Sequence, residues 1–250
     1  MYYKLYFYFI FFMINSNHII ARDLWENRIY LASFPRSGNH WIRYLIEEAT
    51  HIVTSSVYYG EQDAYIEEHC RNHEVKEMPW GGYCYEDGYR RFCRLPSVGN
   101  SFVVKTHFPI IERQKFDLLD YKLTIRIVRH PIDTIYSNYS TGNSAAKFFI
   151  PKKILLDLIQ SWRGFNEFWN NQKNVYTVRY EDLMENPGDC LLQILKKIGY
   201  EVEEYDINRA TSTFSPKGSV LKHLPHYTNE DLKTIKALLG DLMEEFCYEL

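Results

Sequence analysis

The alternation of two kinds of segment most limits how this chain can fold. Short apolar runs that end in polar residues alternate with stretches of helical periodicity. The apolar runs lie at residues 29–32, 102–105, 123–128 and 174–178. The helical stretches lie at residues 39–49, 132–139, 151–169, 187–198 and 229–246. Because buried strands that alternate with helices build parallel sheets, this order predicts an α/β domain with a central, mainly parallel sheet flanked by helices.

The remaining length and the charge of the chain set further limits. Residues 51–100 lack clear periodicity, and we interpret them as an irregular insertion in a single domain spanning residues 28–250. A chain of 250 residues can bury a sizeable core without disulfides or metals. Its formal net charge of −3 argues against a nucleic-acid-binding protein, which would usually carry a strongly basic surface.

The five cysteines do not have the spacing of a metal site. They form neither a C-x-x-C pair nor a Cys/His pattern typical of zinc, so we expect no structural metal. Cys70, Cys84 and Cys93 fall close together in the insertion, where a disulfide is reasonable if the compartment is oxidising.

The N-terminus differs from the rest of the chain. Lys4 precedes an apolar run over residues 5–14, polar residues follow, and the small residue Ala21 offers a cleavage point. Residues 1–21 are therefore interpreted as a signal peptide or a short N-terminal anchor, which favours the secretory pathway or membrane association. The alternative is an aromatic strand or helix that packs on the domain of a cytoplasmic protein.

Ligands of open parallel sheets bind beyond the carboxyl ends of the strands, and the segment at 34–41 follows the first strand. Its sequence, Phe-Pro-Arg-Ser-Gly-Asn-His-Trp, predicts a tight turn and a helix N-terminus whose backbone N–H groups face an anion. Gly38 permits close approach and Arg36 adds positive charge. The segment is not a Walker A loop, so ordinary ATP or GTP hydrolysis is disfavoured. Alone, it could also be a simple cap.

Two further segments follow predicted strands. Lys105 and His107 share one face if the strand persists, which would place a cation beside a base. Arg129 ends a strand and Ser137 lies about two helical turns beyond it, so the two could hold a second phosphate. The alternatives are a surface lysine with a structural histidine, and an Arg129–Asp133 pair with Ser137 exposed.

Taken together, four motifs give a specific resemblance. They are Phe-Pro-Arg-Ser-Gly-Asn-His-Trp at 34–41, Val-Lys-Thr-His-Phe-Pro at 104–109, Val-Arg-His-Pro-Ile-Asp-Thr-Ile-Tyr-Ser at 128–137 and Arg-Tyr-Glu-Asp-Leu at 179–183. The chain resembles the sulfotransferases that use 3′-phosphoadenosine 5′-phosphosulfate (PAPS). Residues 32–59 are similar to carbohydrate sulfotransferases of the WSC-domain-containing group, although no WSC domain is recognised in this sequence. The resemblance implies a P-loop-like, three-layer α/β domain.

The resemblance also assigns roles by position. It places Arg36, Ser37, Gly38, Asn39 and His40 around the 5′-phosphosulfate, where Arg36 replaces the family's usual lysine. It places Arg129 and Ser137 at the 3′-phosphate. Trp41 and Tyr180 would lie near the adenine, and Thr211, Ser212 and Phe214 match the family only loosely there. Lys217 and Gly218 match part of the loop over the 3′-phosphate. His107 corresponds to the catalytic base, Lys105 to the assisting lysine, and Arg36 would share the stabilisation of charge.

The implied reaction is transfer of a sulfuryl group from PAPS to an acceptor hydroxyl, without a metal. Aromatic residues of the insertion could stack on sugar rings or enclose a phenol or lipid: Tyr58, Tyr59, Trp80, Tyr83, Tyr85, Tyr89 and Phe92. A carbohydrate acceptor is the favoured interpretation. Two rivals remain open, a kinase-like nucleotide-dependent transferase and a non-catalytic PAPS-binding protein. The sequence does not indicate the oligomeric state.

Overall fold

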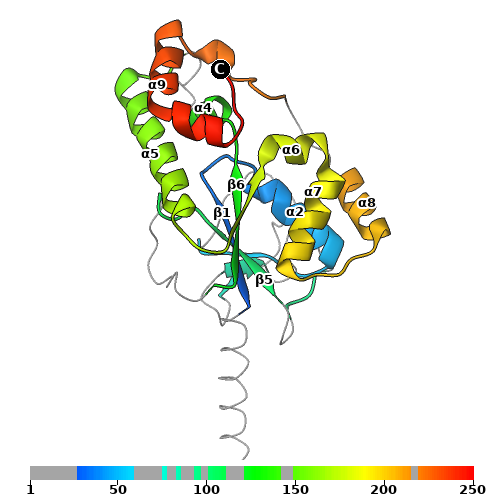
Figure 1. Ribbon diagram of the computed structural model, residues 1–250. Coiled ribbons are helices and arrows are strands. Elements are labelled where there is room, and N and C mark those ends of the chain that lie inside the picture. The colour runs from blue at the N-terminus through cyan, green and yellow to red at the C-terminus, as the bar shows by residue number, and fades with distance from the viewer. Residues whose placement is uncertain are drawn as a thin grey trace, which may run out of the picture.

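A mixed sheet forms the centre of the molecule (Figure 1). The computed structural model describes residues 27–58, 75–77, 83–85, 93–96, 101–110, 121–141, 149–214 and 219–250. Its strands are β1 (Arg28–Ser33), β2 (Ser55–Ser56), β3 (Val75–Glu77), β4 (Tyr83–Tyr85), β5 (Phe102–Thr106), β6 (Leu123–Val128) and β7 (Val175–Arg179). They are arranged in the order β3-β4-β2-β5-β1-β6-β7. The five strands from β2 to β7 in this order are parallel, while β4 and β3 add to them antiparallel.

The register of the parallel strands aligns their carboxyl ends. Ala32 of β1 lies opposite Thr106 of β5 on one side and Arg126 of β6 on the other. Val128 of β6 lies opposite Arg179 of β7, so the chain leaves β1, β5, β6 and β7 at one edge of the sheet. All four predicted motifs lie at this edge.

Helices cover both faces of the sheet. They are α2 (Asn39–Thr50), α4 (Pro131–Ser140), α5 (Lys152–Asn170), α6 (Tyr180–Glu185), α7 (Pro187–Ile198), α8 (Glu204–Thr213) and α9 (Asn229–Glu245), with a short 3₁₀ helix, η1 (Leu224–His226). Figure 1 shows α5 and α9 on one side of the strands and α2, α7 and α8 on the other. This arrangement confirms the predicted three-layer α/β fold.

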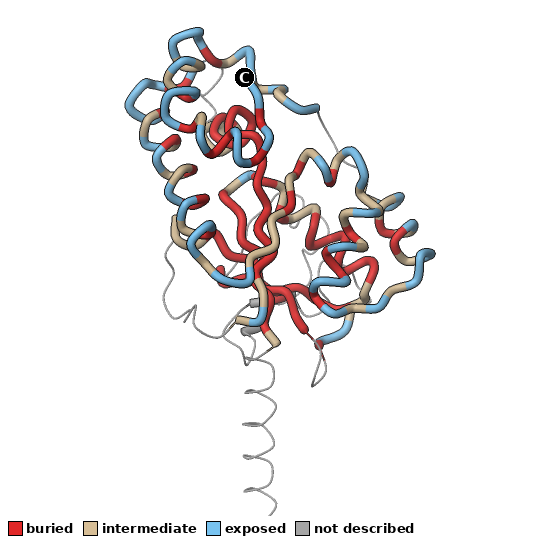
Figure 2. Tube along the Cα trace, viewed as in Figure 1, coloured by how far each residue is buried: buried red, intermediate tan, exposed pale blue. Residues whose placement is uncertain are grey.

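Side-chain alternation on β1 divides the core in two. Tyr30 and Ala32 pack with residues of α4, α5 and α9, whereas Ile29 and Leu31 pack with residues of α2, α7 and α8. Figure 2 shows the strands as an almost continuous buried band between the more exposed outer helices. Burial on both faces explains why the central strands read as unbroken apolar runs.

The boundaries predicted from periodicity agree with the long elements. The apolar run at 123–128 is β6, and the stretch at 187–198 is α7. Helices α6 and α8 were not predicted, because α6 has six residues and α8 buries only Ile207 and Ala210. Neither segment therefore carries an apolar period long enough to recognise.

The insertion is described only in part. Within 51–100, the structure contains β2, β3 and β4, which extend the sheet. Residues 1–21 lie outside the described residues, so the leader stays a prediction. Cys70 also lies outside them, but Cys84 and Cys93 both keep their thiols, and the Cys93 thiol donates to Glu47 O, so the disulfide considered for this group of cysteines is not formed. No helix in the described part of the chain is long and apolar enough to cross a membrane.

Candidate active site

The turn after β1 packs closely against Tyr180. Ser37 N donates to Phe34 O at 3.2 Å, and Gly38, the N-cap residue immediately before α2, adopts φ 96°. A Cβ at Gly38 would lie 2.4 Å from Cδ2 and Cε2 of the Tyr180 ring. Glycine is therefore needed both for the backbone conformation and for the close approach. We call residues 34–39 the cradle.

Buried polar atoms at the cradle have unused hydrogen-bonding capacity. Among the described residues, Ser37 Oγ, Asn39 Oδ1 and Arg129 Nε are buried without a hydrogen-bond partner. The first turn of α2 holds no acidic residue. Since buried polar atoms are normally satisfied, the two donors in this group, the Ser37 hydroxyl and Arg129 Nε, together with the helix N-terminus fit an anionic ligand, whereas Asn39 Oδ1 can only accept.

Arg129 and Ser137 join the cradle from the β6–α4 segment. Arg129 Nη1 donates to Arg36 O at 3.1 Å, and Arg36 Nε donates to Ser137 Oγ at 3.1 Å. The Arg129 guanidinium lies over the Tyr180 ring, 4.5 Å from its centroid. Three residues that the sequence analysis placed at phosphates therefore lie together.

Asp133 holds a neighbouring part of the chain beside Arg129. Its side chain is buried, and its two oxygens accept from Leu221 N at 2.8 Å and His223 N at 3.1 Å. Arg129 Nη2 lies 3.8 Å from Asp133 Oδ2, so the ion pair considered as an alternative is present alongside the cradle contacts. Lys217 and Gly218, the predicted loop residues, lie outside the described residues.

Aromatic side chains lie beside the cradle. The rings of Trp41 and Tyr180 meet edge to face at 5.7 Å, and Trp41 Nε1 donates to Phe214 O at 2.6 Å. Burial raises the pKa of Tyr180, so its phenol is neutral at physiological pH. Thr211 and Ser212 instead donate their hydroxyls to carbonyls of α8. The two firmer predictions for the adenine, Trp41 and Tyr180, are thus adjacent, and Phe214 joins them. His40 lies in the first turn of α2, partly buried.

His107 lies one residue past the end of β5 and is hydrogen-bonded to Ser33, the residue before the cradle. Its Nδ1 is 2.6 Å from Ser33 O, and the Ser33 hydroxyl accepts from Asn39 Nδ2 at 2.9 Å. A carbonyl oxygen can only accept, so Nδ1 carries a proton, and in the neutral imidazole Nε2 carries the lone pair. This tautomer gives the buried imidazole the form required of a general base.

Lys105 and His107 share a neighbour, although β5 ends at Thr106 and the strand that the prediction assumed does not reach His107. The Lys105 ammonium lies 5.7 Å from the centroid of the Tyr58 ring. The imidazole of His107 stacks on the same ring at 5.7 Å and 22°. We call Ser33, Tyr58, Lys105 and His107 the base group.

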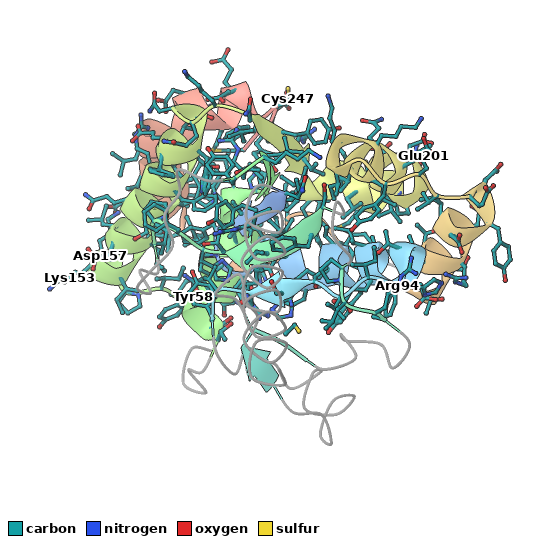
Figure 3. The ribbon with its side chains drawn as sticks, turned by 90° about the horizontal axis from the view of Figure 1, so that it is seen from below. Tyr58, Arg94, Lys153, Asp157, Glu201 and Cys247 are labelled. Atoms are coloured by element: carbon teal, nitrogen blue, oxygen red, sulfur yellow. The ribbon has the colours of Figure 1, made fainter. Side chains whose placement is uncertain are left out.

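A separate cavity of about 350 Å³ lies along β7 and is lined by residues that include Arg126, Arg179 and Cys247. Figure 3 shows Cys247 far from Tyr58, so this cavity is distinct from the base group. In the described part of the chain, no group of three or more His, Cys, Asp or Glu side chains could hold a metal ion.

Comparison with known proteins decides the family. A family model for the sulfotransferase domain matches residues 26–234. The chain belongs to the sulfotransferase domain family. The cradle, the base group and the β6–α4 segment all lie within the matched sulfotransferase domain.

Individual relatives agree with this assignment. A WSCD family member of Aedes aegypti is 29% identical over 192 residues, covering 70% of this chain and 51% of the relative. Sulfotransferase 6B1 of Pan troglodytes is 26% identical over 207 residues, covering 75% and 61%. The chain thus spans about half to three-fifths of the length of these curated relatives. The crystal structure of a mouse sulfotransferase complexed with PAP matches the fold with a TM-score of 0.54 at 17% identity, covering 87% of this chain and 84% of that chain.

Two members of this candidate site were not recognised in the sequence. Ser33 is the last residue of β1, and nothing in its surroundings marks it as a partner of His107. Tyr58 was grouped with the aromatic residues of the acceptor region, whereas its hydroxyl accepts from His107 N at 2.9 Å. Both contacts depend on strand order, which is a property of the folded sheet.

Proposed function

We propose that this protein transfers a sulfuryl group from PAPS to an acceptor hydroxyl. One observation carries the proposal: Ser33 bonds both to Asn39 of the cradle and to the imidazole of His107. An anion-binding turn and a candidate base are therefore only one residue apart in the hydrogen-bond network. Membership of the sulfotransferase domain family, and a fold shared with a sulfotransferase solved with PAP, support this proposal.

The residues present fit the nucleotide donor. The Ser37 hydroxyl, which is buried without a partner, and the backbone N–H groups at the N-terminus of α2 would donate to the 5′-phosphosulfate. Arg129 and Ser137 would hold the 3′-phosphate, while Trp41 and Tyr180 would lie against the adenine. When bound, PAPS supplies the sulfuryl group, and 3′-phosphoadenosine 5′-phosphate (PAP) leaves.

The base group would carry out the proton transfer. As the acceptor oxygen forms its bond to sulfur and the bond from sulfur to the phosphate oxygen breaks, His107 Nε2 takes the hydroxyl proton. Lys105 would stabilise the negative charge that grows on the phosphate oxygen. Arg36 adds positive charge from the cradle, although its side chain bonds to Ser137 and so lies on the 3′-phosphate side.

We propose a carbohydrate as the acceptor. The similarity to a WSCD family member and the aromatic content of the insertion support this choice. Tyr83 and Tyr85 lie in β4, two strands from β5, while Tyr59, Trp80, Tyr89 and Phe92 lie outside the described residues. A secretory or membrane-associated location would suit such an acceptor and is part of the same proposal.

The test is a transfer assay with ³⁵S-labelled PAPS, purified full-length protein, and parallel panels of glycans and small phenols, with and without EDTA. We expect label on a glycan, in amounts that EDTA does not change. Label on phenols alone would overturn the carbohydrate acceptor. Magnesium-dependent consumption of ATP would favour the kinase-like reading, and tight PAP binding without transfer to any acceptor would favour a non-catalytic binding protein.

A further inference from the structure

Tyr58 contacts both functional members of the base group. Its hydroxyl accepts the backbone N–H of His107 at 2.9 Å, and its ring stacks on the imidazole. The same ring lies under the ammonium of Lys105. Tyr58 is buried, as are Lys105 and His107.

Strand pairing places Tyr58 at this position. Ser56 of β2 lies opposite Lys105 of β5, and Val57 N donates to Lys105 O at 3.1 Å. The chain turns immediately after β2, where Tyr58 N donates to Ser56 Oγ at 3.1 Å. The end of β2 thus brings the tyrosine beside His107, although the two residues are 49 positions apart.

The contacts have a specific consequence for the imidazole. His107 lies one residue beyond the end of β5, so the ladder of the sheet does not hold its backbone. The Tyr58 hydroxyl satisfies the backbone N–H, and the ring limits rotation of the imidazole about its side-chain bonds. The 2.6 Å bond from Nδ1 to Ser33 O, which selects the tautomer, requires the imidazole to keep this orientation.

We propose that Tyr58 is a positioning residue, which fixes the orientation and the tautomer of His107 and aligns it with Lys105. This inference rests on the proposed function, since it assigns Tyr58 to the same reaction. Tyr58 would then support proton transfer by His107, whereas the sequence analysis grouped it with the aromatic residues that could stack on the acceptor.

The first test compares two variants of the full-length protein. Tyr58→Phe keeps the ring and removes the hydroxyl, so turnover should fall roughly three- to tenfold, as for loss of one buried hydrogen bond. Tyr58→Leu removes both contacts, and turnover should fall about 100-fold, because small misplacements of a catalytic group have effects of this size. The affinity for PAP, measured by calorimetry, should stay at the wild-type value in both variants.

The matched control is Tyr227→Phe. Tyr227 is also buried, and its hydroxyl donates to the backbone oxygen of Ile132 at 2.9 Å, away from the base group. This variant loses a comparable hydrogen bond and should keep wild-type turnover. Equal losses of turnover in Tyr227→Phe and Tyr58→Phe would indicate a general effect of stability and would overturn the proposal.

The second test reads the imidazole directly and needs no acceptor. Proton–nitrogen NMR of ¹⁵N-histidine-labelled protein at mildly alkaline pH, assigned with His107→Ala, should show His107 protonated at Nδ1. Tyr58→Leu should give a mixture of tautomers, and Tyr58→Phe should largely keep the wild-type signal. A wild-type tautomer in Tyr58→Leu would overturn the proposal.

The two readouts separate this inference from the proposed function. If the wild-type protein transfers no sulfuryl group, the proposed function fails, and the NMR result alone decides whether Tyr58 orients His107. If Tyr58→Leu does not fold, shown by loss of PAP binding and of the thermal transition, Tyr58→Phe decides. Wild-type turnover in Tyr58→Phe with transfer intact would then overturn the proposal.

Discussion

The cradle and the base group lie at the same edge of the sheet but differ in how their polar atoms are satisfied. At the cradle, Ser37 Oγ, Asn39 Oδ1 and the nearby Arg129 Nε are buried without a partner among the described residues. In the base group, the ring and the backbone N–H of His107 both bond to protein atoms. The first arrangement suits binding of a ligand, and the second suits fixing a reactive group before a ligand arrives. The two regions should therefore fail in different ways when they are altered.

Replacing the base should give the largest effect, and it should reduce turnover without reducing nucleotide binding. In His107→Ala, turnover should fall about 10²–10⁴-fold, because a general base is lost. PAP affinity should persist, since the cradle is unchanged. Transfer assays and calorimetry on the same preparation measure both. Near-normal turnover would remove His107 from the role of base.

Arg129→Ala should instead reduce the affinity for PAP. Loss of a charged hydrogen-bond donor should weaken PAP binding roughly 10- to 100-fold. A suitable control is Arg163→Ala. Arg163 of α5 forms a surface ion pair with Asp241 of α9 and is not part of the cradle or the base group. Calorimetric titration with PAP compares the two variants. Equal affinities in the two variants would show that Arg129 does not contact the nucleotide.

Gly38→Ala should damage the cradle through its backbone. The added methyl would meet the Tyr180 ring at 2.4 Å and the backbone would keep a positive φ, so we expect a loss of about 1–3 kcal/mol in stability. PAP binding should fall as well. Gly240→Ala is the control: an added methyl there meets nothing within 4 Å, and Gly240 lies inside α9. That variant should be stabilised by about 0.5–1 kcal/mol. Thermal unfolding that fails to separate the two variants would contradict the close packing at Gly38.

Mild acid should slightly lower the free energy of unfolding, through His130 and His223. Burial lowers the pKa of His130, whose Nδ1 accepts from Ile132 N at the start of α4, and lowers the pKa of His223 to about 4. Below about pH 6.5, the unfolded chain binds more protons at these residues than the folded chain does, so stability falls as the pH falls. The midpoint of thermal unfolding should drop by a few degrees from about pH 7 to about pH 5.

The matched variant for this pH dependence is His130→Asn, which keeps an acceptor near Ile132 N but does not titrate. We expect its unfolding midpoint to change less over the same range. A pH dependence as steep as in the wild type would exclude His130 as a source.

Much of the fold and part of the site could be predicted, because both depend on local patterns. The strand at 123–128 and the helix at 187–198 follow from apolar periodicity. Lys105 and His107, two residues apart in the sequence, do share a neighbour, although β5 ends before His107. The turn at 34–38 follows from its residue types. The alternatives raised for Arg129 were not exclusive, since it contacts both Arg36 and Asp133.

What could not be predicted depends on contacts between distant segments. The roles of Ser33 and Tyr58 require the order β2-β5-β1, which no local pattern specifies. Asp133 binds the backbone at residues 221 and 223, almost ninety residues away, and only the packing of η1 on α4 reveals this. Helix α8 was missed because few of its residues are buried, although its C-terminal end places Phe214 beside Trp41.

The most direct test of the account is calorimetric titration of the full-length protein with PAP and, separately, with ADP and magnesium. The cradle and the Arg129–Ser137 pair predict clear preference for PAP, because PAP has a 3′-phosphate that ADP lacks. ADP binding as tightly as PAP in the presence of magnesium would contradict the second phosphate site and, with it, the assignment of PAPS as the donor.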